Sequence, residues 1–213
     1  MTLDLATIDP ALLKARPAKE GKNILTPICR ISFPTLYNPK AAGKNPKPED
    51  KKKFSCSLLI PSQCDITLLK KMAGDAAMEK WGEKVKEMKI KSPFLQAGDH
   101  KYEGYVPGWW LLRPSSESKP TVVTSKGGSL VVLKDEDAEE VYPGRWATVS
   151  LNAFPYDVNG NKGVAFGLNN IMLLHHDDSL GGRMRAEDEF EAVPGVADTN
   201  TGAPAVGTID NLF

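Results

Sequence analysis

The segment that most restricts the fold of this chain runs from Arg145 to Leu174. Its first part, Arg145–Phe154, alternates residue by residue, and Gly163–Leu174 forms a second strand candidate. Alternation is the period of a β-strand, because successive side chains point to opposite faces. Asn159-Gly160, which lies between the two, is a dipeptide that favours a tight hairpin turn. We therefore expect a β-hairpin here and a mainly β fold around it.

The sequence before this hairpin predicts one helix and several more strands. Asp65 fits the N-cap of a helix that continues to about Met88, in which apolar residues recur every four positions at Leu69, Ala73, Ala77, Trp81 and Val85. The block Asp135–Glu140 is expected to form an acidic loop. Further strands are expected at Pro27–Phe33, Lys53–Ile60, Trp109–Arg113, Thr121–Ser125 and Ser129–Lys134.

A long basic connection separates the first two of these strands. The stretch Pro34–Asp50 contains four prolines and a glycine, which predicts the absence of regular structure. With Lys51–Lys53 added, it carries six lysines against two acidic residues and includes Tyr37. Long loops of this kind are commonly functional or disordered.

The formal net charge of zero conceals two oppositely charged parts. Residues 1–134 contain 23 Lys and Arg against 13 Asp and Glu, whereas residues 135–213 contain 4 against 14. This asymmetry favours a polyanion-binding body with an acidic appendage, although chance clustering on a solvated surface gives the same counts. Ala186–Phe213 has six acidic residues and no Lys or Arg, so it is expected to be disordered.

The strand Arg145–Tyr156 predicts a face suited to nucleic-acid bases. Small apolar residues at the odd positions are expected to point inward: Ala147, Val149, Leu151 and Ala153. The even positions then present aromatic and small hydrogen-bonding side chains: Trp146, Thr148, Ser150, Asn152, Phe154 and Tyr156. Such a face resembles a stacking platform for single-stranded nucleic acid. The alternative is that these aromatics pack beneath a second layer or the helix.

The sequence predicts neither an enzyme nor a cofactor or metal site. Cys29, Cys56 and Cys64 are too few and too scattered for a disulfide framework or a zinc site, and fit small apolar core residues in a reduced protein. Phosphate-binding glycine loops and nucleophile elbows are absent. The cluster from His175 to Asp178 is the one metal candidate, but adjacent residues on a strand face opposite ways. Because Met1–Pro10 has acidic and no basic residues, we do not expect it to be a secretory signal, and no apolar run in the sequence approaches the length that spans a membrane.

Several segments resemble a known family. The sequence YPGRWATVSLNAFPYDVNGNKGVAFGLNNIMLL (Tyr142–Leu174) is similar to the signature hairpin of bacteriophage single-stranded-DNA-binding proteins of the OB-fold type, and KKFSCSLLIP (Lys52–Pro61) with the following helix matches the same family. The ending at Asp210–Phe213 resembles the acidic, Phe-terminated tails of such proteins, although Asp210 is the one acid close to the end.

The resemblance implies a five-stranded Greek-key OB-fold barrel with one inserted helix region and extra strands, followed by a disordered acidic tail. We expect an N-terminal arm at 1–22, a DNA-binding domain at 23–180 and the tail at 181–213. The connection Pro34–Asp50 would join the first two barrel strands beside the groove. Asp210, Leu212 and Phe213 would dock replication or recombination proteins.

The predicted function is to coat and protect single-stranded DNA without strong sequence preference during phage replication, recombination or repair, in the cytoplasm of the infected host. Self-association on DNA is compatible with it. Alternatives are a strand-annealing protein, a virion structural protein and a small metal-dependent nuclease using His175, His176 and Asp178. The predicted DNA contacts are Tyr37, Lys40, Lys44, Lys47, Lys51, Lys52, Lys53, Trp109, Arg113, Arg145, Trp146, Phe154, Tyr156 and Lys162.

Overall fold

The structure is a computed structural model that describes residues 3–41, 43 and 46–181. The predictions for Lys44 and for the tail, with its docking residues Asp210, Leu212 and Phe213, therefore lie outside the described residues. No helix in these ranges is long and apolar enough to cross a membrane.

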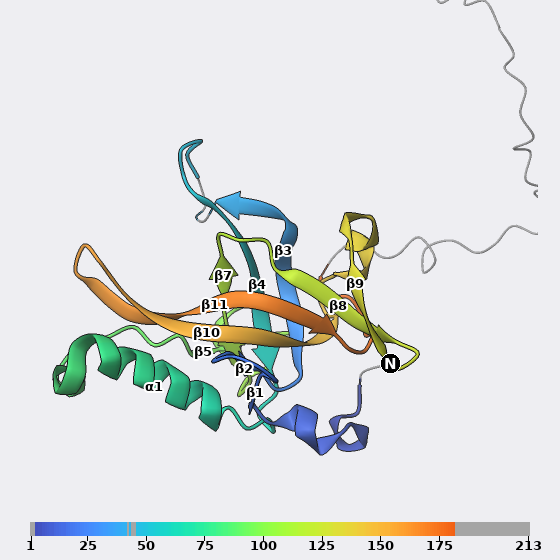
Figure 1. The fold of residues 1–213 in the computed structure, drawn as a ribbon, viewed down its shortest axis with the longest axis horizontal. Helices are drawn as coiled ribbons and strands as arrows, with labels where there is room; N and C mark the ends of the chain where they lie inside the picture. The colour runs from blue at the N-terminus through green and yellow to red at the C-terminus, as the bar shows by residue number, and fades with distance from the viewer. Residues whose placement is uncertain (1–2, 42, 44–45, 182–213) are drawn as a thin grey trace, which may run out of the picture. The chain divides into compact units, whose positions relative to one another are not determined.

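Short elements surround a few long strands (Figure 1). The helices are α1 (Thr67–Trp81) and the 3₁₀ turns η1 (Leu5–Thr7), η2 (Pro10–Leu13), η3 (Gly82–Lys86), η4 (Ala97–Asp99) and η5 (Asp135–Glu140). The strands are β1 (Arg16–Pro17), β2 (Ile24–Leu25), β3 (Cys29–Ala41), β4 (Lys52–Ile60), β5 (Leu95–Gln96), β6 (Trp110–Leu112), β7 (Ser115–Ser116), β8 (Thr121–Lys126), β9 (Ser129–Leu133), β10 (Trp146–Val158) and β11 (Asn161–Leu173).

Five strands close into a barrel in the order β3, β4, β7, β11, β10 and back to β3. The pairing of β7 with β11 is parallel, whereas the other pairings in this ring are antiparallel. Closure leaves the barrel without a free sheet edge. The predicted five-stranded OB-type barrel, with one helix and extra strands, is confirmed.

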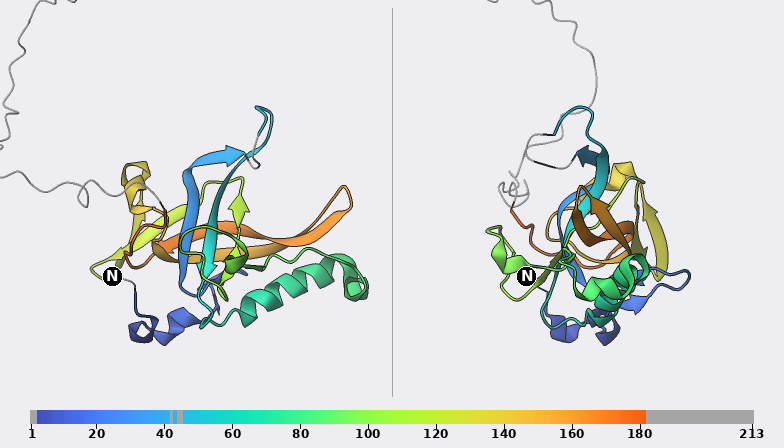
Figure 2. Two further views of the ribbon diagram at one scale, coloured as in Figure 1. Left: turned by 180° about the vertical axis from the view of Figure 1, so that it is seen from behind. Right: turned by 90° about the vertical axis from the view of Figure 1, so that its left-hand side faces the viewer.

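The hairpin formed by β10 and β11 is also confirmed. It pairs from Ala147 with Leu173 to Val158 with Asn161, and Asn159 and Gly160 have positive φ angles of 50° and 79°. Positive φ at both turn residues is what a two-residue hairpin turn requires. Figures 1 and 2 show this ribbon extending past the barrel with α1 alongside it.

The strand β3 continues much further than predicted. It runs to Ala41, so the expectation that Pro34–Asp50 lacks regular structure is wrong for its first half. The prolines are tolerated because Pro34 and Pro39 lie at the two register shifts of the β3–β4 ladder, where neither has a partner. Proline lacks an N–H and is accepted in strands at such irregular positions.

The first half of β10 is buried on both faces. Residues from Trp146 to Leu151 are all buried, and the side chain of Trp146 is 1% exposed. The prediction that the even positions face outward is therefore wrong for Trp146, Thr148 and Ser150. Residues 3–26 and the segment after β11 cover the outside of the barrel here, since the Thr26 carbonyl accepts a hydrogen bond from Thr148 and Asp177 accepts one from Trp146.

The predicted helix and the cysteines behave largely as expected. The helix α1 ends at Gly82, which has a φ of 58°, rather than near Met88. The three cysteines are buried core residues, as predicted. Desolvation raises the pKa of Cys29 to about 12 and that of Cys64 to about 11, so both thiols stay protonated at neutral pH.

Candidate nucleic-acid interface

Four aromatic rings gather beside β3 and β6, one of them, Tyr105, being buried. Tyr102 contacts Phe33 edge-on at 5.1 Å between ring centroids and Tyr105 at 5.3 Å. The ring of His100 stacks on Tyr102 at 6.4 Å, and Arg113 lies 3.3 Å from His100 Nε2. Two of the rings are open to solvent, because Phe33 is 55% and Tyr102 54% exposed.

The backbone of Phe33 holds its ring outward in a costly conformation. Its φ is 46°, in the left-handed region, and it lies at the register shift between Ser32 and Thr35. A non-glycine residue there is disfavoured by about 1–2 kcal/mol, and such residues cluster at functional sites. The bulge directs the large apolar ring of Phe33 into solvent beside Tyr102. The hydrophobic effect alone would favour burying this ring.

Arg113 connects these rings to a fifth ring, that of Tyr156. Both line a hollow of about 160 Å³ next to Ser92, Leu95 and Phe166. We define the aromatic surface as Phe33, His100, Tyr102, Tyr105, Arg113 and Tyr156. It combines two exposed rings on which bases can stack, Phe33 and Tyr102, with a guanidinium that can pair with phosphate or stack on a base, whereas Tyr105 is buried behind them at 8% exposure. Two predicted contacts, Arg113 and Tyr156, belong to it.

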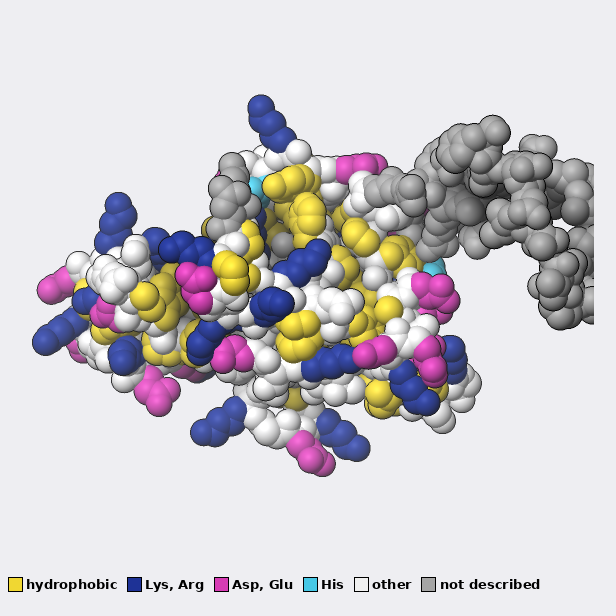
Figure 3. All heavy atoms as spheres, turned by 90° about the horizontal axis from the view of Figure 1, so that it is seen from above, with side chains coloured by type: hydrophobic (Ala, Val, Ile, Leu, Met, Phe, Trp, Pro, Cys, Tyr) yellow, Lys and Arg dark blue, Asp and Glu magenta, His cyan; other side chains and the backbone are white. Residues whose placement is uncertain are grey.

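Most of the predicted lysines lie around the connection between β3 and β4. Lys40 pairs with Lys53 across the ladder and Ala41 with Lys52. Lys40, Lys47, Lys51 and Lys52 are exposed, and Lys53 is half-buried. Glu117 lies 3.5 Å from Lys51 and 3.8 Å from Lys53, so these two lysines are partly neutralised. The upper face shows Lys and Arg side chains interspersed with apolar ones (Figure 3).

Two further predicted contacts remain accessible on the β10–β11 ribbon. Phe154 is 39% exposed and pairs across the ladder with Ala165. Lys162 lies 3.7 Å from Asp157. Neither has a ring or charge contact with Phe33 or Tyr102 among the described residues.

Tyr37 is placed differently from the other aromatics. Its ring packs against the core, with Lys119 Nζ 5.1 Å from the ring centroid. Burial, with the charges of Asp137 and Asp135, raises its pKa. Its hydroxyl is buried without a hydrogen-bond partner in the described part of the chain. The structure therefore does not bring Tyr37 into the aromatic surface.

Arg145 and Trp146 are buried in this fold, and Trp109 is partly buried. Arg145 is 3% exposed and lies 3.4 Å from Glu140, so the expectation of a solvent-facing phosphate contact is wrong. The Glu140 carboxylate compensates the charge of Arg145. Burying an unpaired guanidinium would be costly. Trp109 is partly buried and packs against Trp146 at 6.2 Å between ring centroids.

The candidate metal cluster, His175–Asp178, contains a buried carboxylate, that of Asp177, which links Trp146 to Arg30. Asp177 Oδ2 accepts a hydrogen bond from Trp146 Nε1 at 2.6 Å and lies 3.7 Å from Arg30. Burial alone would raise the pKa of Asp177, but the hydrogen bonds from Trp146, Asp178 N and Leu3 N and the charge of Arg30 lower it below its ordinary value. Among the described residues, no group of three or more His, Cys, Asp and Glu could hold a metal.

The lowered pKa of Asp177 predicts that the protein loses stability at acidic pH. The folded-state pKa is lower than the unfolded-state pKa of about 3.9. The ionised Asp177 carboxylate therefore contributes fully to the free energy of unfolding above the unfolded-state pKa, and this contribution is lost as the pH falls through the folded-state pKa. Asp177→Asn should therefore reduce the free energy of unfolding by about 1.5–3 kcal/mol at pH 7, the usual worth of a charged hydrogen bond. Urea titrations at pH 7 and pH 3 measure this. If wild type and Asp177→Asn differ in unfolding free energy by the same amount at both pH values, the proposed contribution of the Asp177 carboxylate is contradicted.

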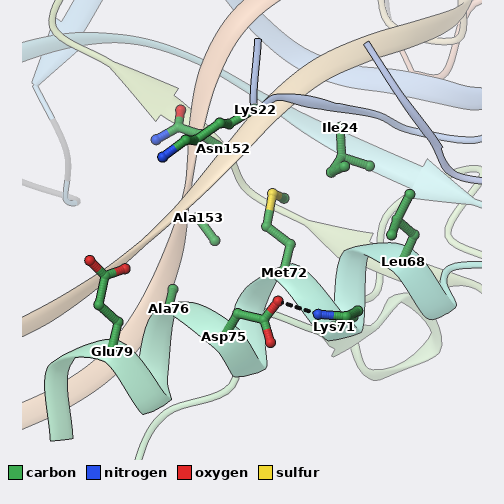
Figure 4. Close-up of a pocket in the computed structure, with 10 residues that line it drawn as sticks. All are labelled: Lys22, Ile24, Leu68, Lys71, Met72, Asp75, Ala76, Glu79, Asn152 and Ala153. Carbon is green, nitrogen blue, oxygen red and sulfur yellow. Dashed lines mark hydrogen bonds and ion pairs between the residues drawn. The ribbon is translucent and has the colours of Figure 1, made fainter.

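A second hollow, of about 440 Å³, lies between α1 and β10 (Figure 4). Lys22 and Lys71 line it, but so do Asp75 and Glu79, and Lys71 Nζ is 2.6 Å from Asp75 Oδ2. Balanced charge gives a polyanion no net attraction. The candidate interface is therefore the aromatic surface, not this hollow.

Sequence reasoning missed four members of the aromatic surface: Phe33, His100, Tyr102 and Tyr105. Phe33 ended a predicted core strand, and its outward turn depends on the bulge. The other three lie between η4 and β6, where no strand or helix pattern drew attention. The available signal was composition, because residues 100–105 carry three aromatic or imidazole rings beside Lys101 in a polar stretch.

Comparisons with known proteins agree with this architecture. The family model described as "Enterobacter phage Enc34, ssDNA-binding protein" matches residues 22–201. The single-stranded DNA-binding protein of bacteriophage Enc34, solved in complex with ssDNA, is 20% identical with a TM-score of 0.59, over 78% of this chain and 98% of that chain. Another structure of the Enc34 protein is 21% identical with a TM-score of 0.58, over 83% of this chain and 99% of that chain.

A single-stranded DNA binding protein of bacteriophage T7, gp2.5, is 18% identical with a TM-score of 0.50, over 81% of this chain and 99% of that chain. These likenesses concern the fold. No match was found among curated proteins.

Proposed function

Because this chain belongs to the family of single-stranded-DNA-binding proteins described for Enterobacter phage Enc34, we propose that it binds single-stranded DNA without strong sequence preference. The observation that carries the proposal is the exposed ring pair Phe33 and Tyr102, held beside Arg113 on the outside of an OB-type barrel. Base stacking on aromatic rings tolerates any sequence, because every base has a π-face.

In this proposal the bases stack on Phe33, Tyr102 and Tyr156, and Phe154 extends the stacking along the ribbon. The phosphates are neutralised by Arg113 and by the predicted lysine contacts Lys40, Lys44, Lys47, Lys51, Lys52, Lys53 and Lys162. The protein would coat and protect phage DNA during replication, recombination or repair in the cytoplasm of the infected host. The complex of the related Enc34 protein with ssDNA supports the DNA-binding part of this proposal.

Salt dependence tests the proposal. Neutralising phosphates releases counterions, so log K should fall against log salt with a slope of about −3.5 if about five phosphates are contacted, at roughly −0.7 per contact. Fluorescence-anisotropy titrations with labelled oligonucleotides of several sequences and of RNA measure the slope and the preference. A flat salt response would refute phosphate binding by these lysines.

Two alternatives are tested in the same samples. A strand-annealing protein would make complementary strands pair faster than they do alone. A nuclease using His175, His176 and Asp178 would cleave labelled DNA with Mg²⁺ or Mn²⁺. The hydrogen bond from Trp146 and the ion pair with Arg30 favour a structural role for Asp177 over catalysis.

The acidic segment Ala186–Phe213 is proposed to compete with DNA and to recruit partner proteins. Removing it changes the formal charge from 0 to +6. A segment tethered to the same chain can reach a millimolar effective concentration at a basic surface, and its competition weakens as salt screens the charges. Partner proteins would then dock at Asp210, Leu212 and Phe213 when DNA displaces the segment.

A truncation ending at Arg185 should therefore bind single strands more tightly than the full chain at low salt, and the advantage should shrink as salt rises. The matched control is a full-length variant in which the six acids of the segment become Asn or Gln. It should behave like the truncation. Equal affinities of truncated and full-length protein at low salt would rule out the competition.

A further inference from the structure

The strand β9 is an exposed apolar edge. It ends the strand order of the sheet, pairing only with β8 in the described part of the chain (Figure 1). Three consecutive side chains on it face solvent, because Leu130 is 67%, Val131 37% and Val132 58% exposed. Monomeric proteins normally protect such an edge with charge, proline or a covering element.

The turn of the β8–β9 hairpin shows which backbone groups lie on the open side. Gly127 and Gly128 have φ angles of 57° and 79°, and Lys126 pairs with Ser129 around them. In a two-residue hairpin the pair that closes the turn is hydrogen-bonded, and the following pairs alternate. Leu130 and Val132 are therefore in the non-hydrogen-bonded pairs, and their N–H and C=O groups point to the free edge.

This edge is complementary to itself. We propose that two copies of the chain associate through antiparallel pairing of β9 with β9, with the two-fold axis at Val131. Leu130 then faces Val132 of the second copy, and each such pair exchanges both N–H···O=C bonds. The side chains of these two residues also become apolar cross-strand neighbours, which stabilises a sheet.

The charges at the two ends of the strand fit the same arrangement. Antiparallel pairing places the turn end of one β9, next to Lys126, beside the other end of the second β9, where η5 (Asp135–Glu140) follows. Lys126 and Glu136 are both exposed in the single chain. Basic turn and acidic η5 thus meet at each end of the contact, and the two-fold axis repeats the arrangement. An isologous contact of this kind closes as a dimer.

Self-association through β9 does not depend on DNA binding, so its test is performed without DNA. Sedimentation velocity of the full chain over a concentration series should show a monomer–dimer equilibrium. The double variant Leu130→Lys, Val132→Lys places like charges opposite each other and should raise the dimer Kd at least about tenfold. Val158→Lys, which changes another exposed strand valine, is the matched control and should sediment as wild type.

A cysteine pair tests the register itself. In Val131→Cys the two thiols lie at the two-fold axis, with Cα atoms about 4.5 Å apart, which a disulfide can bridge. In Leu130→Cys the two cysteines are diagonal and more than about 7 Å apart, too far for a disulfide. Under mild oxidation the first should cross-link as a dimer at least about tenfold faster. A wild-type chain that stays monomeric, or equal cross-linking of the two variants, would overturn the proposal.

Discussion

Replacing Phe33 and Tyr102 with alanine should weaken single-stranded DNA binding strongly while leaving the fold intact. Each stacked base contributes about 1–3 kcal/mol, and both rings are more than half exposed. The two rings touch at 5.1 Å between centroids, so the double variant should lose less than the sum of the single losses. Oligonucleotide titrations at one fixed salt concentration, with thermal melting of each variant, measure both quantities.

The backbone of Phe33 provides a sharper version of this experiment. Phe33→Gly removes the ring but also relieves the left-handed conformation, so it should be more stable than Phe33→Ala by about 1 kcal/mol while binding DNA equally weakly. Phe33→Trp retains a stacking ring and should retain affinity. Wild-type affinity in Phe33→Ala would show that the aromatic surface is not the DNA site.

Phe154→Ala compares this surface with the face predicted from the sequence. Phe154 is exposed on β10, so its ring can stack on a base without any rearrangement of the core. A larger loss for Phe154→Ala than for Phe33→Ala would move the principal contact from the barrel wall to the ribbon.

The hairpin was predictable because its signals are local. Alternation in β10 and the Asn159-Gly160 turn define neighbouring strands without reference to the rest of the chain. Such short-range patterns specify register whenever one face is buried. The resemblance to phage proteins then supplied the barrel closure, which requires pairing between strands far apart in sequence.

The site was less predictable because burial depends on distant segments. Period-two alternation gives two faces but does not say which is covered, and in β10 the chain before β3 and the segment after β11 cover the second one. The exposure of Phe33 has the opposite cause, since a bulge turns out a residue that the pattern assigns to the core. Both errors arise from tertiary contacts that no local window contains.

The largest expected loss of stability is at Trp146. Its ring is 1% exposed, Arg30 lies over it at 5.6 Å, and its Nε1 donates to Asp177. Trp146→Ala should destabilise the fold by about 3–5 kcal/mol through the cavity, and by about 1–3 kcal/mol more because the Asp177 carboxylate loses its donor. Typical domains have about 5–15 kcal/mol in total, so this variant is expected to be largely unfolded or insoluble.

Two milder variants separate the core role of Trp146 from the predicted stacking role. Trp146→Phe keeps most of the ring volume but not the N–H, and combining it with Asp177→Asn measures the coupling in a double-mutant cycle. Trp146→Leu removes any ring that could stack. It should melt at a lower temperature yet, at temperatures where it is folded, bind single strands as tightly as wild type. Wild-type stability with weakened binding in Trp146→Leu would instead place Trp146 against DNA and contradict its burial beneath Asp177.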